Sequence, residues 1–467
     1  MDINKIAQFI SKIFDESAIP TLKKYIKIKA KSPIFDENWE TNGFLKQSCK
    51  MVEEWCQSLN IEGLQTQVIT PEGRTPLLLI EIEASSSKKG TTLIYGHLDK
   101  QPEFSGWDQN KGPFTPVVEN NRLYGRGSAD DGYSVFSGLC AIKALKTQNI
   151  LHNKVVMLIE SGEESGSPDL SYYIKKYSNR LGNVDLVICL DSGCGDYERL
   201  WVTNSLRGTV VGNLEVKVLK QGIHSGNSGI AASSFRILRN ILDRIEDSET
   251  GEVKIKGLTP KIPDKTMEMI QKSVGILGKN IYDAVPFVDE AKPVVDSPLD
   301  LLINSTWKPA LSYIGIDGIP SFKQAGSVLR PSTSICLSLR LPPGIDPDKT
   351  LLLLKKTLEE NPPYNAEITF TPIGGANGWV MPQMTDKLFN AIDESSKIFF
   401  NNNACLMGEG GSIPFMNSLA EQFPKTQFII TGVLGPNSNA HGPNEFLHIP
   451  YVKKLTSALA YIIASHH

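Results

Sequence analysis

The chain has 467 residues, more than one hydrophobic core usually serves, so we expect two domains. Its 40% hydrophobic, 21% charged and 8% aromatic residues are typical of a globular protein. A net charge of −3 and the lack of a basic-aromatic pattern disfavour a nucleic-acid binder. The amino terminus lacks the pattern of a signal peptide and no apolar run is long enough to span a bilayer, so we expect no membrane association. Seven scattered cysteines indicate free thiols in a reducing compartment, and we expect a cytoplasmic protein.

The amino-terminal part of the chain alternates between helical and strand-like patterns. Apolar residues at helical spacing predict one or two amphipathic helices over 3–31 and another near 44–55. The elements expected next are strands 66–70, 77–83 and 91–95, a helix from about 135, strand 155–160, a helix near 170–177 and strand 185–190. This alternation predicts an α/β domain with a mixed, mostly parallel sheet sandwiched by helices. Functional residues of such sheets gather at the carboxyl ends of the strands.

From about residue 206 the pattern changes to that of a smaller α+β domain. The elements expected here are strands 212–220 and 334–341, which alternate in period two, helices 231–245 and 346–358, and strand 367–371. Asp346 followed by Pro347 is a typical helix start. The βαββαβ order indicates a ferredoxin-like domain inserted into the larger one.

A helix near 387–400, strand 427–431 and a helix over 451–464 then resume the α/β pattern. We therefore expect a larger domain built from 1–205 and 377–467, with residues 206–376 as the inserted domain. The stretch 250–310, rich in Pro and Lys, gives no assignment.

A histidine and a carboxylate follow the buried strand 91–95. His97 and Asp99 stand two positions apart, and such residues point the same way in an extended chain. Asp99 can then accept the second imidazole N–H of a metal-binding His97 and fix its tautomer. An ordinary capped strand end explains the same residues about equally well.

Further oxygen and nitrogen donors follow other strands or turns. The candidate ligands are His97, Asp130, Glu164, Asp191 and His441. Such donors suit zinc, manganese or cobalt, and five of them fit two ions that share one bridging carboxylate. Glu163 stands beside Glu164, and because two adjacent carboxylates cannot serve one site equally, one can bind metal while the other takes a proton from the attacking water. A solvated acidic loop remains the alternative for this pair of glutamates taken alone.

Taken together, these stretches resemble the di-metal peptidase family that contains the aminoacylases, glutamate carboxypeptidases, carnosinases and cytosolic non-specific dipeptidases. The likeness is greatest to the carnosinase and non-specific dipeptidase branch and runs in the same order through nearly the whole chain. The matching stretches are Gly96–Asp99 with Gln101-Pro102, Gly106-Trp107-Asp108, Pro113-Phe114, Leu123–Asp131, Glu163–Ser167, Asp191, Leu206–Gly208, His224–Gly226, Glu409–Pro414 and His441–Glu445. The resemblance implies a di-zinc exopeptidase-like catalytic domain with an inserted lid and dimerisation domain.

The resemblance also implies roles for the donors. His97, Asp130 and Asp191 would hold one ion, and Asp130, Glu164 and His441 the other, with Asp130 as the bridge. The ions would be Zn²⁺, with Mn²⁺ or Co²⁺ as alternatives. Asp99 would orient His97, and Glu163 would act as general base and later as proton donor.

Residues of the inserted domain and of the loop near 410 would bind substrate. His224 would reach the active site of the partner in a homodimer and stabilise the oxyanion. Arg340 would bind the substrate carboxylate through its bidentate fork, although a surface ion pair is the simpler interpretation without the resemblance. Ser327 falls where the dipeptidases usually carry threonine. Backbone N–H groups and a hydroxyl for the substrate would come from Gly410, Gly411 and Ser412.

The expected function is hydrolysis of dipeptides or short peptides with a free C-terminal carboxylate. A deacylase of N-acyl amino acids with the same fold needs the same metals and Arg340, and no sequence feature separates the two. A catalytically inactive binding protein is disfavoured by the intact donor set and by Glu163. One position departs from the family: Gly132 stands where a lysine usually follows the double aspartate.

Overall fold

The computed structural model describes residues 1–85, 90–283, 285–413 and 415–466. The chain forms two compact units. The first unit consists of Met1–Asn204, Met381–Met407 and Ser418–His467, and the second of Ser205–Val380 and Gly408–Asn417. The chain passes between them within strands β8 (Trp201–Leu206) and β16 (Cys405–Glu409), and β15 (Trp379–Val380) pairs antiparallel with β8.

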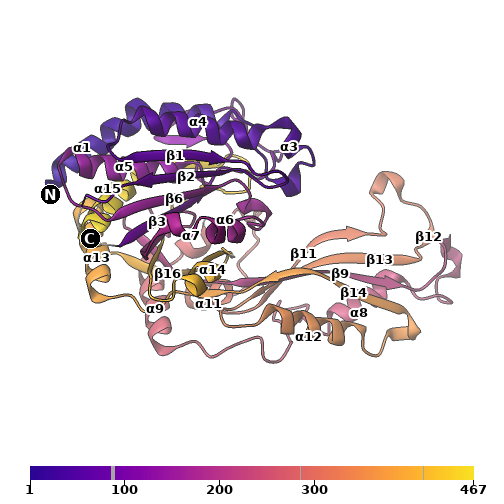
Figure 1. Ribbon diagram of the computed structural model, residues 1–467. Coiled ribbons are helices and arrows are strands. Elements are labelled where there is room, and N and C mark those ends of the chain that lie inside the picture. The colour runs from indigo at the N-terminus through magenta and orange to yellow at the C-terminus, as the bar shows by residue number, and fades with distance from the viewer. Residues whose placement is uncertain (86–89, 284, 414, 467) are drawn as a thin grey trace. The chain divides into compact units, whose positions relative to one another are not determined.

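A six-stranded sheet forms the centre of the first unit. Its order is β1 (Leu64–Ile69), β2 (Leu77–Ile82), β6 (Lys154–Glu160), β3 (Thr91–His97), β7 (Val184–Cys189) and β17 (Gln427–Ile430), and Figure 1 shows the first four strands side by side. The pairs β6–β3, β3–β7 and β7–β17 are parallel, and the two pairs at the β1 edge are antiparallel. Every residue of β3 is buried, which is typical of a strand covered on both faces. The predicted mixed, mostly parallel sheet is therefore confirmed.

Helices complete the first unit. They are α1 (Ile3–Ile13), α2 (Ile19–Ile26), α3 (Trp39–Asn42), α4 (Phe44–Ser58), α5 (Tyr133–Thr147), α6 (Leu170–Lys176), α7 (Ser178–Leu181), α13 (Asp386–Phe400) and α15 (Ile449–His466), with a π-helical turn Phe14–Ala18 between α1 and α2. Helix α14 (Phe415–Gln422) begins in the second unit and ends in the first. Helix α5 contacts β3 and β6, and α15 packs against α5 and α13. Because α5 is apolar on almost all sides, it lies almost wholly inside the unit. A small antiparallel sheet contains β4 (Val117–Glu119), β5 (Arg122–Tyr124) and β18 (Phe446–His448).

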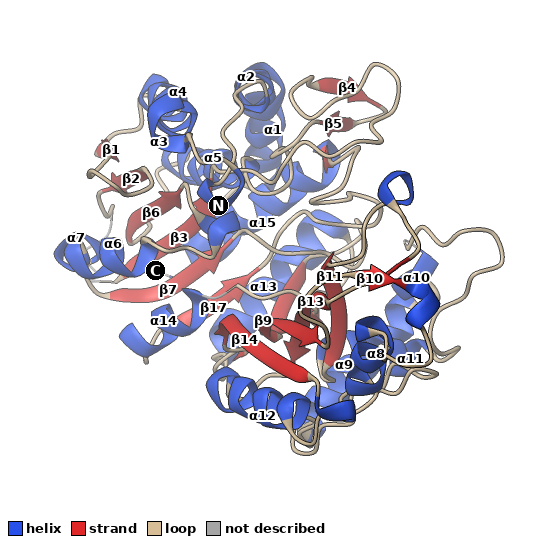
Figure 2. Ribbon diagram, turned by 90° about the vertical axis from the view of Figure 1, so that its right-hand side faces the viewer, coloured by secondary structure: helices blue, strands red, loops and turns tan. Residues whose placement is uncertain are grey.

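The second unit contains a four-stranded antiparallel sheet covered by two helices. The strand order is β11 (Ala310–Asp317), β13 (Ser332–Leu341), β9 (Gly208–Lys217) and β14 (Glu367–Ala376). Helices α8 (Ser234–Leu242) and α12 (Pro347–Glu359) lie against this sheet, as Figure 2 shows. Leu214, Leu337 and Phe370 of the sheet belong to the core between them. Residues of β13 alternate strictly between buried and half-buried, which is the predicted period-two pattern. The predicted βαββαβ, ferredoxin-like arrangement is confirmed.

Asp346 caps α12 as predicted, because its side chain accepts hydrogen bonds from the backbone N–H groups of Asp348 and Lys349. The stretch 250–310, which received no assignment, contains α9 (Asp264–Leu277), α10 (Asn280–Asp283) and α11 (Pro298–Thr306). Only Ile270, Ser273 and Leu277 of α9 are buried, so its apolar stripe is too weak to be seen as a pattern.

No helix in the described part of the chain is both long enough and apolar enough to cross a bilayer. All seven cysteines are free thiols, and six of them are buried.

Candidate metal centre

The predicted donors of the first unit meet at one edge of its sheet. His97 is the last residue of β3, Glu164 lies in a 3₁₀ turn (Glu163–Ser165) after β6, and Asp191 follows β7. Because β6, β3 and β7 are neighbouring parallel strands, their carboxyl ends lie together. Asp130 precedes α5 and His441 precedes β18, and both loops reach the same edge.

The five donors form two triads that share Asp130. The donor atoms of His97, Asp130 and Asp191 lie within 4.8 Å of one another, as do those of Asp130, Glu164 and His441. His97 Nε2 is 3.2 Å from Asp130 Oδ1, whereas His441 Nε2 is 3.0 Å from Asp130 Oδ2. Each oxygen of this carboxylate therefore faces a different histidine, which is the arrangement that a bridging ligand requires.

The charge and burial of these groups fit a pair of cations. Burial raises the pKa of Glu164 to about 8 and that of Asp191 to about 6, and the charge of Asp130 adds to both effects. Glu164 Oε1 is buried with no hydrogen-bond partner, although Gln101 donates to Oε2. A divalent cation in each triad would offset this crowding of carboxylates, and imidazole nitrogen and carboxylate oxygen suit Zn²⁺, Mn²⁺ or Co²⁺.

Asp99 contacts more of the site than the sequence indicated. Its Oδ1 lies 3.4 Å from His97 Nδ1, but the backbone carbonyl oxygen of Asp99 is nearer, at 3.2 Å. The same carboxylate accepts the backbone N–H groups of Glu163 (3.1 Å) and Glu164 (3.0 Å). One buried carboxylate thus supports both the histidine and the loop that carries the two glutamates.

Glu163, which precedes the ligand Glu164, is half-buried beside the triads. Burial raises its pKa well above the usual range, and the charge of Asp191 raises it further. A carboxyl group in such surroundings binds a proton more readily than an exposed one, so it suits a group that must accept a proton and give it up again.

The departure at Gly132 has a steric explanation. A Cβ on Gly132 would lie 2.3 Å from Cε1 of Tyr25 and 2.5 Å from the carbonyl oxygen of Gly127, so no side chain fits. A different lysine, the buried Lys100, lies near Gly132. Lys100 Nζ donates to three backbone carbonyl oxygens at the end of α2 and lies 4.0 Å from the centre of the Tyr25 ring. Burial lowers the pKa of Lys100 to about 7.

The second unit brings together Arg340, Ser412 and Gly410 around a second arginine. Arg340 Nη1 donates to Ser412 Oγ (3.0 Å), and that hydroxyl donates to the carbonyl oxygen of Arg207 (2.6 Å). Arg207 Nε in turn donates to the carbonyl oxygen of Gly410 (3.1 Å). Burial and the charge of Arg340 lower the pKa of Arg207 to about 10. Two guanidinium groups held by neutral partners make this a place where an anion binds favourably.

A Cβ on Gly410 would lie 2.9 Å from the carbonyl oxygen of Ser305 and 3.1 Å from Arg207 Nη2, so the loop needs glycine there. Gly411 has open space around its Cβ position. Arg207 belongs to the matching stretch Leu206–Gly208, but the sequence predicts no role for it. A single arginine next to a strand-like stretch is normally a surface residue, so its sequence signal is weak.

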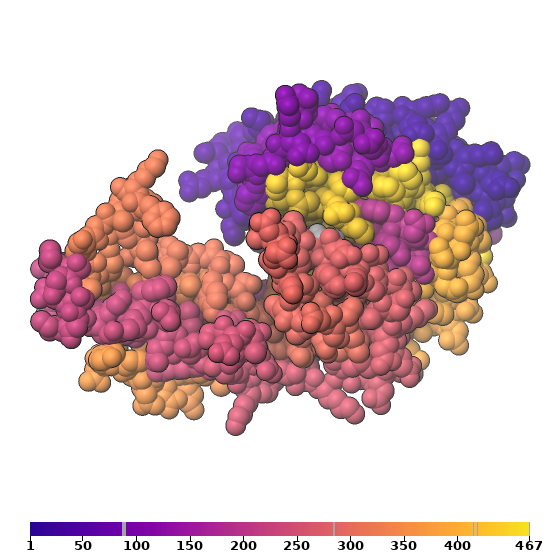
Figure 3. All heavy atoms as spheres, turned by 180° about the vertical axis from the view of Figure 1, so that it is seen from behind, coloured from indigo at the N-terminus to yellow at the C-terminus, as the bar shows by residue number. Residues whose placement is uncertain are grey.

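His224 and Ser327 lie together in another part of the second unit. The short strands β10 (Ile223–His224) and β12 (Val328–Leu329) pair, and Ser225 N donates to the carbonyl oxygen of Ser327 (2.9 Å). Figure 3 shows the two chain segments that carry these strands side by side, in magenta and in orange. The exposed His224 accepts the N–H of Gly226 at Nδ1 (3.0 Å), which leaves its proton on Nε2, free to be donated.

Comparison with known proteins agrees with the fold. The chain is 25% identical to the human Beta-Ala-His dipeptidase over 95% of its length and 88% of that protein. It is 26% identical to the probable di- and tripeptidase DUG2 of Saccharomyces cerevisiae, over 84% of this chain but only 44% of that longer protein. The solved structure of the dipeptidase Dug1p from the same yeast superimposes with a TM-score of 0.80, at 24% identity, and covers 100% of this chain and 99% of Dug1p.

The family model of peptidase family M20/M25/M40 matches residues 93–465, which include every predicted metal ligand. The resemblance to the carnosinase-like dipeptidases is thereby confirmed. The chain belongs to the peptidase family M20/M25/M40 and is a metallopeptidase.

Proposed function

We propose that this protein is a dipeptidase that hydrolyses the peptide bond of dipeptides or short peptides with a free C-terminal carboxylate. The observation that carries the proposal is the Asp130 carboxylate, shared between two donor triads beside the half-buried Glu163. The relatives add support, since they include a Beta-Ala-His dipeptidase and a probable di- and tripeptidase.

We propose that His97, Asp130 and Asp191 hold one ion and that Asp130, Glu164 and His441 hold the other. Zn²⁺ is the ion we favour, with Mn²⁺ or Co²⁺ as alternatives of the same donor chemistry. When bound, such ions polarise the scissile carbonyl and lower the pKa of the attacking water.

The protein's own residues supply the remaining steps. Glu163 takes a proton from the attacking water and then gives it to the leaving amine. Asp99 keeps His97 in place and holds the loop of Glu163 through its two N–H contacts. Arg340, with Ser412 and the backbone of Gly410 and Gly411, binds the substrate carboxylate.

A deacylase of N-acyl amino acids, the alternative expected from the sequence, needs the same metals and the same carboxylate site, but the relatives, which are dipeptidases, do not favour it. The two are distinguished by turnover of a panel of dipeptides and N-acyl amino acids, with zinc, manganese or cobalt each added to metal-stripped protein. Faster turnover of the dipeptides supports the proposal, and turnover of N-acyl amino acids alone overturns it.

Arg340→Lys is expected to raise KM and to lower kcat/KM for free-acid dipeptides by about 10-fold or more, because an ammonium group cannot reproduce the two-point contact of a guanidinium. C-terminally amidated dipeptides should already be poor substrates of the wild-type enzyme. Steady-state kinetics on the free-acid and amidated form of one dipeptide measure both effects. Equal rates on the two forms would remove the carboxylate-binding role of Arg340.

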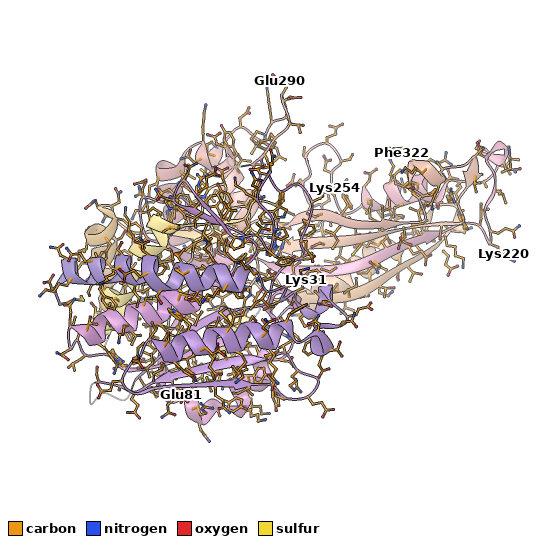
Figure 4. The ribbon with its side chains drawn as sticks, turned by 90° about the horizontal axis from the view of Figure 1, so that it is seen from above. Lys31, Glu81, Lys220, Lys254, Glu290 and Phe322 are labelled. Carbon is orange, nitrogen blue, oxygen red and sulfur yellow. The ribbon has the colours of Figure 1, made fainter. Side chains whose placement is uncertain are left out.

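We further propose a homodimer formed through the second unit. Strand β11 is an edge strand, and its side chains Tyr313, Ile314 and Ile316 are 46%, 59% and 50% exposed. Phe322, labelled in Figure 4, is fully exposed beyond the end of this strand. An exposed apolar edge of this kind favours pairing with another chain. In this dimer His224, with Ser327 beside it, serves the active site of the partner, where the Nε2–H group of His224 donates a hydrogen bond to the developing oxyanion.

The free thiols fit our expectation of a cytoplasmic protein.

Mixed dimers test this role of His224. His224→Ala and Glu163→Ala should each be nearly inactive as homodimers. After dissociation, equal mixing and reassembly, half of the dimers are mixed, and each mixed dimer has one complete site, so activity should return to about a quarter of wild type. Native mass spectrometry shows whether mixed dimers form. Their formation without any return of activity would mean that His224 does not act across the interface.

A further inference from the structure

Two charged residues outside the donor set lie buried between the loops that carry Asp130 and His441. Arg126 is 1% exposed and Glu445 is fully buried, and Arg126 Nη1 lies 2.7 Å from Glu445 Oε2. Removing two charges from water costs free energy, which good geometry and additional hydrogen bonds can offset. The other hydrogen bonds of these two side chains therefore matter.

The carboxylate of Glu445 is bonded to the loop of Asp130. Its Oε1 accepts the backbone N–H groups of Ala129 (3.1 Å) and Asp130 (3.3 Å). The backbone carbonyl of Glu445 also accepts the N–H of Gly125 (3.0 Å). The position of the Asp130 backbone therefore depends on a residue more than 300 positions later in the chain.

The guanidinium group of Arg126 is bonded to the loop of His441. Its Nη2 donates to the carbonyl oxygens of His441 (3.1 Å) and Gly442 (2.8 Å), and its Nε donates to that of Pro102 (3.2 Å). The His441 backbone has φ 64°, a left-handed conformation that a residue with a side chain keeps only where its surroundings hold it. The His441 side chain is 55% exposed, so packing does little to fix it.

We propose that Arg126 and Glu445 are positioning residues of the second metal site, which keep Asp130 and His441 at the separation where both bind one ion. Each member of the pair reaches the backbone of one of these residues, and the ion pair ties the two loops together. His97 and Asp191 belong to the ends of β3 and β7 and receive none of these bonds, so the first site depends on the pair less. The inference rests on the proposed function only through its assignment of the two metal triads.

The test is a metal titration of metal-stripped protein with Zn²⁺, followed by competition with a chromophoric chelator. Wild type should bind two ions per chain. In Arg126→Lys, which keeps the charge but loses the fork of donors, and in Glu445→Gln, which keeps the shape but loses the charge, one of the two ions should lose affinity by about 10- to 100-fold. The other ion should lose less than about 3-fold, a difference that general destabilisation would not produce.

Glu81→Gln is a matched control. Glu81, labelled in Figure 4, is a largely buried carboxylate of β2 that pairs with Arg180 and Lys154 and bonds to no donor loop. The Glu81→Gln variant should have a lower urea midpoint of unfolding than wild type, yet it should bind both ions with wild-type affinity. Wild-type affinities in both folded test variants would overturn the inference, as would the same selective loss in Glu81→Gln. Failure of both test variants to fold would also overturn it, since the pair would then serve folding and not positioning. Failure of wild type to bind two ions would instead count against the proposed function.

Discussion

Asp130→Ala should lose both metal ions and, with them, at least about 10³-fold in kcat/KM, because the ions supply several kcal/mol of transition-state stabilisation. The structural reason is that Asp130 turns one oxygen toward each triad: Oδ1 toward His97 and Oδ2 toward His441. Without it, each half-site keeps only one histidine and one carboxylate, and no anion remains between the two ions to offset their repulsion. Elemental analysis after gel filtration measures the metal content per chain.

Asp191→Ala is the control for this result. It removes a donor of the first triad only, so one ion per chain should remain in the triad of Asp130, Glu164 and His441. Retention of two ions in Asp130→Ala would show that this carboxylate is not the bridge. Loss of both ions in Asp191→Ala would show that the two sites cannot be filled independently.

Glu163→Gln should keep both ions and lose about 10²- to 10⁴-fold in kcat, the usual cost of removing a general base. The amide has nearly the shape of the acid, and the backbone N–H that bonds to Asp99 is unchanged, so the loop should stay in place. Metal analysis and single-turnover kinetics on the same preparation separate binding from chemistry.

The neighbouring variant Glu164→Gln provides the contrast, because Glu164 belongs to the second triad and Glu163 to neither. We expect Glu164→Gln to lose metal from that triad and to regain part of its activity at high metal concentration. Exchanged phenotypes, with metal loss in Glu163→Gln and metal retention in Glu164→Gln, would reverse the roles proposed for the pair.

Local patterns were enough to predict most of the architecture. The strict alternation of β13 and the cap of α12 by Asp346 follow from side-chain period and from local hydrogen bonding, and both are present as predicted. The strands that end at or just before His97, Glu164 and Asp191 were predicted from their apolar runs. The rule that parallel strands present functional residues at their carboxyl ends then predicted that these donors lie close together. The same reasoning failed for α9, α10 and α11, since their short or weak apolar faces leave no clear period.

The arrangement of the candidate site depends on tertiary contacts that local sequence patterns do not predict. Sequence order indicates which donors exist, but only the folded chain turns the two oxygens of Asp130 toward different histidines and lets Asp99 hold the loop of both glutamates. Gly132 departs from the family pattern because the ring of Tyr25, more than 100 positions earlier in the chain, leaves no room for a side chain there. Arg126 and Glu445 are 319 positions apart, so no sequence period relates them. Composition and periodicity are local and record which face of an element is buried, whereas a buried charge needs a partner at hydrogen-bond distance, and tertiary packing alone selects that partner.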